Sequence, residues 1–269
     1  MKTRAITAFF FTIVMLGSVL LGGTVFTVFY LLLSLLSLAE FYKLIRTTEI
    51  KPHVLLGYIG GALIFGCLAA RQLFEIDVKY LLLIIPAIFA VFLAELYRKD
   101  KHPFTNISYT FLGLILVSVP FCFFYALGFL KDLEIYNYHF PLAFMLMLWA
   151  SDTGAYLFGR KLGKNKLFPR HSPKKTWEGF AGGVFVSVLV GLIISFYFTE
   201  VSGFVWAGMA VLIVSFGTLG DLVESMLKRS LDVKDSGTLL PGHGGLLDRF
   251  DGLLIAAPLV FVYLYLILY

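Results

Sequence analysis

The sequence predicts an all-α polytopic integral membrane protein with about nine transmembrane helices. Three observations support this fold class: 59% of the 269 residues are hydrophobic, only 14% are charged, and apolar stretches recur along the whole chain. Soluble domains carry about 25% charged residues, so this chain cannot cover a water-facing globule. The sequence shows no soluble domain, low-complexity tract or solenoid-type repeat.

Nine apolar stretches approach the roughly 20 residues that a helix needs to cross a bilayer core of about 30 Å. Their expected ranges are 5–21, 24–39, 53–70, 80–96, 105–127, 139–158, 179–198, 203–227 and 252–269. The first resembles a signal peptide, but it lacks a clear cleavage site and another apolar stretch follows at once, so we interpret it as a retained span. A tight hairpin at Gly22-Gly23 is expected to join the first two spans. Cys67 and Cys122 lie inside apolar stretches and are expected to be buried thiols without a disulfide or metal.

The basic residues predict the orientation of the spans, because cytoplasmic loops collect Lys and Arg. With the N-terminus inside, 19 of the 22 Lys and Arg residues fall on the cytoplasmic side and three fall outside. This predicts a cytoplasmic N-terminus, an external C-terminus and a multi-pass protein of the cell's inner (cytoplasmic) membrane. The two long polar loops, 159–178 and 228–251, then lie on the same cytoplasmic side.

The stretch GTLGDLVESMLKRS places Asp221, Glu224, Ser225 and Lys228 on one face of a helix. Asp221 and Glu224 lie at or inside the bilayer boundary, where a carboxylate is costly unless something compensates its charge. An ion pair with Lys228 is an alternative explanation for Glu224. Asp221 has no basic partner in the local sequence, so a bound cation explains it better.

Two further acids, Asp248 and Asp251, lie three residues apart at the start of the ninth span, after Gly244-Gly245. Capping of the helix N-terminus is the alternative role for Asp251. Carboxylates from two neighbouring helices suit Mg²⁺ rather than a soft metal, with or without a second cation. His243 lacks a second His or Cys nearby, so it gives little support for zinc. The predicted metal ligands are Asp221, Glu224, Asp248 and Asp251.

The loop GRKLGKNKLFPRHSPKKTWEG carries seven basic residues and one acid. The positive-inside bias or contacts with anionic headgroups explain its first four basic residues. SPKKTWEG, in contrast, is predicted to be an ordered turn that aims two ammonium groups and a hydroxyl at a polyphosphate. It lacks the glycine spacing of a Walker loop. The predicted substrate contacts in this turn are Ser172, Lys174, Lys175, Thr176 and Glu178.

Asp152 falls within the sixth span, beside Ser151, Thr153 and Gly154, which indicate a face that is not exposed to lipid. An intramembrane Asp is a functional candidate. Acids surrounded by cations on one side of a bilayer are typical of phosphoryl or nucleotidyl transfer with metal help.

These motifs resemble the signature of the phosphatidate cytidylyltransferase family of bacterial type, also called CDP-diacylglycerol synthases. The resemblance covers about 27 consecutive residues and rests on Ser225, Lys228, Arg229, Lys234, Asp235, Gly237, Leu240, Pro241, His243, Gly244, Gly245, Asp248, Arg249 and Asp251. SDTGAYLFGR and SPKKTWEG also resemble upstream motifs of the family, in the same order. Spans one to five resemble the family only in being apolar, without a matching motif.

The resemblance implies that CTP and phosphatidic acid give CDP-diacylglycerol and pyrophosphate with Mg²⁺, for phospholipid biosynthesis in the membrane. It also implies a homodimer, and no nucleic-acid partner is expected. A phosphate monoester is mostly ionised at neutral pH, so no general base is required. The residues expected to act in catalysis are Asp221, Asp248, Asp251, Lys228, Arg229 and Arg249. Further substrate contacts are expected from Ser225, Lys234, Asp235, His243, Gly244, Gly245 and Asp152.

Three other classes of protein are weighed against this one. A CTP-dependent polyprenol kinase would share the phosphate chemistry but should lack the unbroken stretch from His243 to Asp251. A CDP-alcohol phosphotransferase needs further acids downstream, and the 18 residues after Asp251 hold none. A cation-coupled transporter places its ionisable residues near the midplane and often has repeated halves, which this sequence does not show. We therefore predict a membrane scaffold at 1–138 and a catalytic membrane domain at 139–269.

Overall fold

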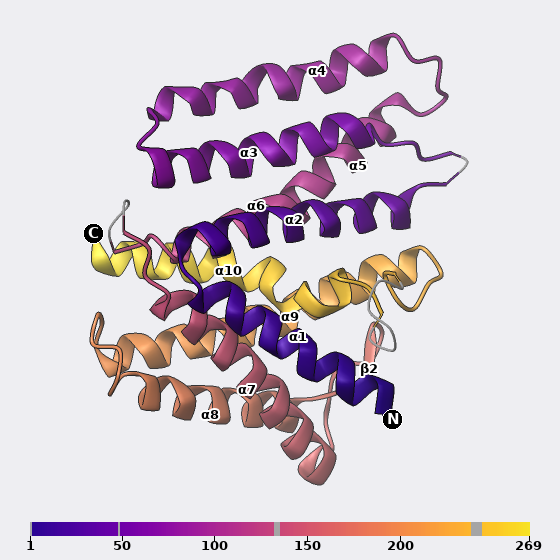
Figure 1. Cartoon of the computed structure of the whole chain (residues 1–269). Coiled ribbons are helices and arrows are strands. Elements are labelled where there is room, and N and C mark those ends of the chain that lie inside the picture. The colour runs from indigo at the N-terminus through magenta and orange to yellow at the C-terminus, as the bar shows by residue number, and fades with distance from the viewer. Residues whose placement is uncertain (1, 48, 132–134, 238–243) are drawn as a thin grey trace. The chain divides into compact units, whose positions relative to one another are not determined.

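The computed structural model describes residues 2–47, 49–131, 135–237 and 244–269, and it confirms the all-α fold class (Figure 1). The helices are α1 (Lys2–Leu20), α2 (Gly23–Ile45), α3 (Val54–Phe74), α4 (Ile84–Leu96), α5 (Pro103–Gly113), α6 (Val119–Leu127), α7 (His139–Leu162), α8 (Trp177–Ile194), α9 (Gly203–Ser230) and α10 (Leu247–Leu268). The shorter elements are the 3₁₀ helix η1 (Val78–Leu83), the π-helical turn η2 (Leu114–Ser118) and the strands β1 (Lys166–Phe168) and β2 (Ser172–Thr176).

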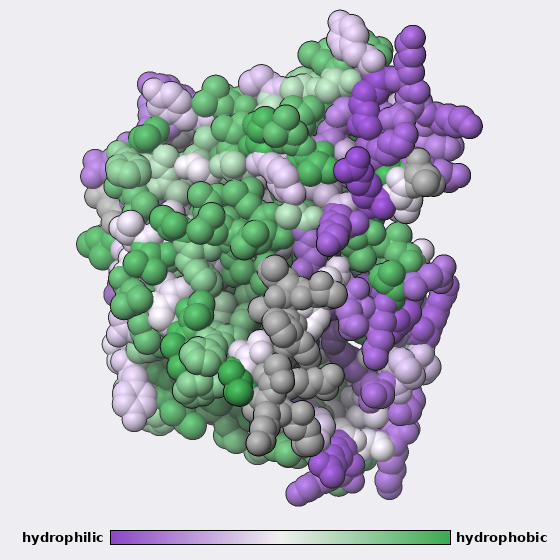
Figure 2. Space-filling model, turned by 45° about the vertical axis from the view of Figure 1, so that its right-hand side comes forward, coloured by the Kyte–Doolittle hydropathy of each residue, from purple (hydrophilic) through white to green (hydrophobic). Residues whose placement is uncertain are grey.

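Eight segments in the described part of the chain are long and apolar enough to cross a membrane, so this is a multi-pass membrane protein. The segments are 23–45, 54–74, 79–96, 103–127, 139–162, 177–194, 203–230 and 247–268. The first predicted span corresponds to α1, whose apolar part, Ile6–Leu20, is shorter. Figure 2 shows hydrophobic side chains over the flanks of the helices and hydrophilic side chains near their ends, as expected for helices that cross a bilayer.

The chain divides into two compact units that do not follow chain order. Unit 1 comprises Met1–Tyr136 together with Asp235–Arg249, and unit 2 comprises Asn137–Lys234 together with Phe250–Tyr269. The segment 235–249 carries much of the family signature, and we call it the signature segment. It belongs structurally with the N-terminal helices, whereas the predicted catalytic domain included it with spans six to nine.

Within unit 1, α2, α3 and α4 lie side by side, and α5 leads through η2 into α6 (Figure 1). The π-helical turn immediately precedes α6, whose second residue is Pro120, and a proline has no backbone N–H to donate to the preceding turn. Aromatic rings fill the space between α2, α3 and α6, with Tyr125 packed against Phe26 and Phe65 at centroid distances of 5.7 and 4.8 Å. The predicted hairpin lies between α1 and α2, where Gly22 adopts a φ of 102°, a conformation that favours glycine.

The N-terminal scaffold contains a buried acid, Glu95, near the end of α4. Glu95 is 2% exposed, accepts a hydrogen bond of 2.8 Å from Asn106 Nδ2 and pairs with His53. Arg98 Nη1 lies 3.5 Å from the same carboxylate. These contacts join the start of α3, the end of α4 and α5, so Glu95 has a structural role in the scaffold.

Unit 2 is built on close packing of α7, α8 and α9 (Figure 1). A Cβ atom on Gly154 of α7 would lie 2.6 Å from the carbonyl oxygen of Gly182 in α8, so the two backbones approach to a distance that only small residues allow. Ser187 Oγ then donates a hydrogen bond of 3.0 Å from α8 to the carbonyl of Met147 in α7. The strands β1 and β2 form an antiparallel hairpin between α7 and α8.

The predicted orientation has a direct test, because Lys166 is exposed on β1 and Lys79 is exposed on η1. In a cysteine-free background, a cysteine at position 166 should react with a membrane-impermeant reagent only when the cytoplasmic side is opened. A cysteine at position 79 should react in intact cells. Labelling at position 166 from outside intact cells would contradict the topology.

Candidate functional site

Unit 2 holds three neighbouring carboxylates from two helices. Asp221 and Glu224 lie one turn apart on α9, and Asp251 lies on α10. One carboxylate oxygen of each residue lies within 4.8 Å of those of the other two. We call these three residues the acidic group. Hard oxygen ligands at this spacing suit Mg²⁺, so the donor set fits the metal that the sequence predicts.

A glycine contact brings the two helices of the acidic group together. A Cβ atom on Gly220 would lie 2.3 Å from the carbonyl oxygen of Asp251 and 3.4 Å from the Cα atom of Gly252. The side-chain hydrogen of glycine therefore sets how closely α9 and α10 approach, one residue before Asp221. Sequence reasoning found the acids but not this contact, because a single glycine in an apolar helix gives no distinctive pattern.

Two lysines form ion pairs with members of the acidic group. Lys228 Nζ lies 2.6 Å from Glu224 Oε2, so the ion pair considered as the alternative for Glu224 is present. Lys175 of β2 pairs with Asp221 Oδ2, so Asp221 has a basic partner that lies outside its local sequence. The local sequence could not show the partner, because Lys175 comes from the hairpin before α8. Ser225 Oγ donates a hydrogen bond of 3.2 Å to Asp221 Oδ1.

A fourth acid, Asp152, interacts electrostatically with the acidic group. Asp152 lies on α7 with an exposed side chain, and both its carboxylate and that of Asp221 repel the carboxylate of Asp251, whereas Lys175 attracts it. The helix α10 begins at Leu247, so Asp251 lies beyond its first turn. The capping role considered for Asp251 is therefore not what the structure shows.

The basic segment before α8 is an extended strand where the sequence predicted a turn. Its backbone pairs with β1, which holds Ser172–Thr176 in an extended form and leaves Lys174 exposed. Thr176 is buried and caps α8 by accepting a hydrogen bond of 3.1 Å from Gly179 N. Glu178 accepts hydrogen bonds from Lys164 N and from Asn165 Nδ2, at 3.1 and 2.7 Å. Thr176 and Glu178 thus hold the hairpin, while Lys175 reaches the acidic group.

The end of α9 exposes two of the predicted basic residues. Arg229 is exposed, and its Nη1 donates a hydrogen bond of 3.0 Å to the carbonyl of Val233. Lys234, the last residue of this part of unit 2, is also exposed. Their predicted phosphate contacts stay predictions.

The signature segment is organised in unit 1 around Asp248. Asp248 Oδ2 accepts hydrogen bonds from Gly245 N at 2.8 Å and from Ser236 N at 3.0 Å. Gly244 adopts a φ of 82°, a conformation that favours glycine and bends the backbone just before Gly245. Asp235 and Arg249 are exposed, and His243 lies outside the described residues.

One carboxylate in the first half of the chain was missed by sequence reasoning. Glu40 lies near the end of α2 and contacts the signature segment in unit 1. The second predicted span ended one residue before it, at 39. The sequence did contain a signal for Glu40. An acid at the end of an apolar helix costs free energy unless a partner compensates its charge, so a partner for this carboxylate was to be expected.

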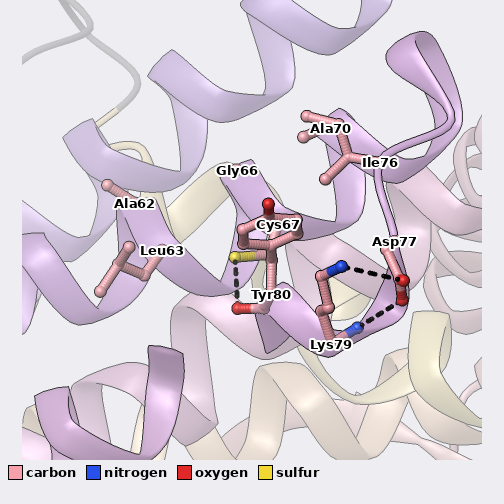
Figure 3. Close-up of a pocket in the computed structure, with 9 residues that line it drawn as sticks. All are labelled: Ala62, Leu63, Gly66, Cys67, Ala70, Ile76, Asp77, Lys79 and Tyr80. Atoms are coloured by element: carbon pink, nitrogen blue, oxygen red, sulfur yellow. Dashed lines mark hydrogen bonds and ion pairs between the residues drawn. The ribbon is translucent and has the colours of Figure 1, made fainter. Parts of the chain in front are cut away.

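A separate pocket in unit 1 has a different character from the acidic group (Figure 3). It has a volume of about 490 Å³ and lies between α3 and η1. Cys67 Sγ donates to the carbonyl of Tyr80 at 3.5 Å, and Lys79 pairs with Asp77 at 3.4 Å. The residues that line it include none of the predicted site residues, so we do not assign it to the same chemistry.

The fold and the site define a class: a multi-pass membrane protein with three carboxylates and two lysines gathered in unit 2. A family model described as the cytidylyltransferase family matches residues 2–267. The chain belongs to this family.

Several curated relatives match over almost the whole chain. The phosphatidate cytidylyltransferase of Staphylococcus aureus (strain COL) is 37% identical over 262 residues, which cover 97% of each chain. That of Staphylococcus epidermidis (strain ATCC 12228 / FDA PCI 1200) is 36% identical over 263 residues, again 97% of each chain. That of Bacillus subtilis (strain 168) is 36% identical over 263 residues, 97% of this chain and 96% of the relative.

Proposed function

We propose that this chain is a phosphatidate cytidylyltransferase, which converts CTP and phosphatidic acid into CDP-diacylglycerol and pyrophosphate. The observation that carries the proposal is the similarity to phosphatidate cytidylyltransferases across 97% of the chain. The acidic group with its two lysines supports it, because both substrates are anions whose phosphates must be brought together.

In the proposed reaction, an oxygen of the lipid phosphate attacks the α-phosphorus of CTP. The new P–O bond forms as the bond between the α-phosphorus and the bridging oxygen breaks, and pyrophosphate leaves with that electron pair. The attacking phosphate is mostly ionised at neutral pH, so no residue needs to remove a proton. The protein must instead orient the phosphates and neutralise their charge.

Asp221, Glu224 and Asp251 would hold the Mg²⁺ that we propose as the cofactor. Bound Mg²⁺ would supply positive charge against the triphosphate. Lys175 and Lys228 lie against these carboxylates, and we propose that their ammonium groups turn to the phosphates when substrate enters. From the sequence, Asp248 is still predicted to bind the metal, and Arg249 is still predicted to contact a phosphate.

Three further features belong to the same proposal. Phosphatidic acid keeps its acyl chains in the bilayer while CTP arrives from the cytoplasm, so the reaction centre should lie at the cytoplasmic surface of the plasma membrane. The relatives are bacterial, which supports that membrane. A homodimer is proposed from the family resemblance and can be checked by the mass of the purified protein in detergent.

The deciding experiment uses purified protein, phosphatidic acid in mixed micelles and CTP labelled at either the α- or the γ-phosphorus. Cytidylyl transfer moves only the α-label into the lipid fraction and releases the γ-label as pyrophosphate. A kinase would move only the γ-label into lipid. No transfer of either label by folded protein would favour the transporter class.

Within the basic loop, Lys175→Ala is expected to lower turnover about a hundredfold, the scale of losing one preorganised donor. Lys175 touches the acidic group, and Lys174→Ala, at an exposed neighbouring position, should cost less. Lys161→Ala and Lys164→Ala should change the rate little, because both side chains are exposed in the positive-inside loop. Steady-state rates of the four variants check this prediction. Equal losses at all four positions would indicate instead that the basic residues act together, as a diffuse positive charge that attracts lipid headgroups.

A further inference from the structure

Glu40 is a buried carboxylate that the proposed reaction does not use. The residue is 9% exposed, and its hydrogen-bond donors come from the other end of the chain. Glu40 Oε1 accepts from Ser236 Oγ at 2.5 Å and from Leu247 N at 3.0 Å. Glu40 Oε2 accepts from Leu246 N at 2.9 Å. One side chain of α2 therefore binds three groups of the signature segment.

These three donors lie on both sides of residues 238–243. Ser236 precedes that stretch, and Leu246 and Leu247 follow it at the start of α10. Asp248 Oδ2 binds Ser236 N and Gly245 N in the same two flanks. The two carboxylates, one from α2 and one from the signature itself, therefore hold the flanks of the same stretch together.

The chemistry of the contact requires a carboxylate at position 40. All three partners are donors, and each oxygen of Glu40 accepts at least one backbone N–H. The first N–H groups of a helix have no acceptor within the helix, and negative charge is favoured there. An amide in the same place would turn its NH₂ group toward an N–H donor in either of its two orientations.

Two glycines of the signature are explained by the same side chain. A Cβ atom on Gly245 would lie 2.0 Å from Glu40 Oε1, and one on Gly237 would lie 2.7 Å from Glu40 Oε2. Distances this short are not possible between a carbon and an oxygen that are not bonded. The backbone can wrap around the carboxylate only because both positions lack a side chain.

We propose that Glu40 is a positioning residue that holds the signature segment in the form needed for cytidylyl transfer. It acts through Ser236 and through the start of α10. The first turn of α10 carries Asp248 and Arg249. The inference rests on the proposed function, because its consequence for catalysis is measured on that reaction. The structural part, that Glu40 protects the amides of Leu246 and Leu247, is measured without any reaction.

The test compares Glu40→Gln with the unmodified protein in detergent. Hydrogen–deuterium exchange should become faster in peptides that cover 244–250, while peptides from α7 and α8 keep their protection. The value of kcat/KM for CTP should fall about tenfold to a hundredfold, the scale of losing hydrogen bonds to a charged group. General unfolding would instead accelerate exchange throughout the chain, and this outcome would overturn the proposal.

Ser37→Ala is the matched control on the same helix. Ser37 is fully buried, and its hydroxyl has no hydrogen-bond partner within the part of the chain that the structure describes. The variant should keep both the exchange pattern and kcat/KM. If Glu40→Gln behaved like Ser37→Ala while the unmodified protein was active, the positioning role would be wrong. If the unmodified protein transferred no cytidylyl group, the proposed function would fail and the exchange data would still test the contact.

A double-mutant cycle provides an independent measurement. Gly245→Ala should lower kcat/KM strongly because its methyl group meets both Glu40 Oε1 and Ser236 Oγ, and Glu40→Ala should lower it by removing the hydrogen bonds. The double variant should lose less than the product of the two single losses, since the methyl group no longer meets the carboxylate and Ser236 Oγ, released from Glu40, can turn away from it. Losses that multiply would show that the two positions act independently and would overturn the proposal.

Discussion

Asp251→Asn is expected to lower cytidylyl transfer about a thousandfold while leaving the folded protein intact. The change removes one negative charge from the acidic group at nearly constant volume. A loss of about 4 kcal/mol in transition-state stabilisation corresponds to this factor. Initial rates with α-labelled CTP measure the effect, and calorimetric titration of the purified variant with Mg²⁺ or Mn²⁺ measures metal binding without turnover.

The stability of the same variant should move in the opposite direction to its activity. The carboxylate oxygens of Asp221, Glu224 and Asp251 lie within 4.8 Å of one another, so Asp251→Asn removes repulsion between like charges and should leave the thermal midpoint of the metal-free protein unchanged or raise it. Glu200→Gln is the matched control, because Glu200 pairs with His139 at another part of unit 2. It should lower the midpoint and preserve the rate. Normal activity and normal metal binding in Asp251→Asn would remove Asp251 from the proposed metal site.

Gly220→Ala is expected to abolish activity almost completely by separating α9 from α10. Its Cβ atom would meet the backbone carbonyl of Asp251 at 2.3 Å, and backbone cannot move aside as a flexible side chain can. The helices must shift, which spreads the oxygens of the acidic group and costs about 1–3 kcal/mol of stability, the usual range for an overpacked core. Initial rates, metal titration and thermal unfolding in detergent measure the three effects.

Gly66→Ala is the control for the general effect of a methyl group on a helical glycine. A Cβ atom on Gly66 of α3 would meet no atom within 4 Å, and alanine favours the helix. This variant should keep normal activity and unchanged or slightly higher stability. A Gly220→Ala protein with normal metal binding would show that α9 and α10 can separate without disturbing the acidic group.

The fold was largely predictable because its signal is local. Each span is a long apolar stretch, and the predicted ranges coincide with helices of the structure to within several residues. The β-hairpin was not predicted, because Ser172–Thr176 reads as a polar turn until its pairing with Lys166–Phe168 is seen. The place of the signature segment in unit 1 was not predicted either, since it depends on contacts of that segment with α2.

The candidate site was predictable in its residue types but not in its pairings. Asp221, Glu224 and Asp251 stood out as acids at the ends of apolar helices, and Lys228 lies one turn from Glu224 on the same helix. The partner of Asp221 could not be found in the same way, because Lys175 reaches it from another element. Such pairings depend on how helices pack, and the spacing of residues along one helix does not encode them.

The sequence by itself determined the membrane class, the order of the spans and the family, because hydropathy and a dense signature are properties of contiguous residues. Only the tertiary structure decided that Gly220 sets the approach of α9 to α10 and that Glu40 holds the signature segment. Glu40 lies 206 residues before Leu246, whose backbone N–H donates a hydrogen bond to the Glu40 carboxylate. The physical reason is that a buried carboxylate is stable only against specific donors, and the folded chain alone brings those donors to it.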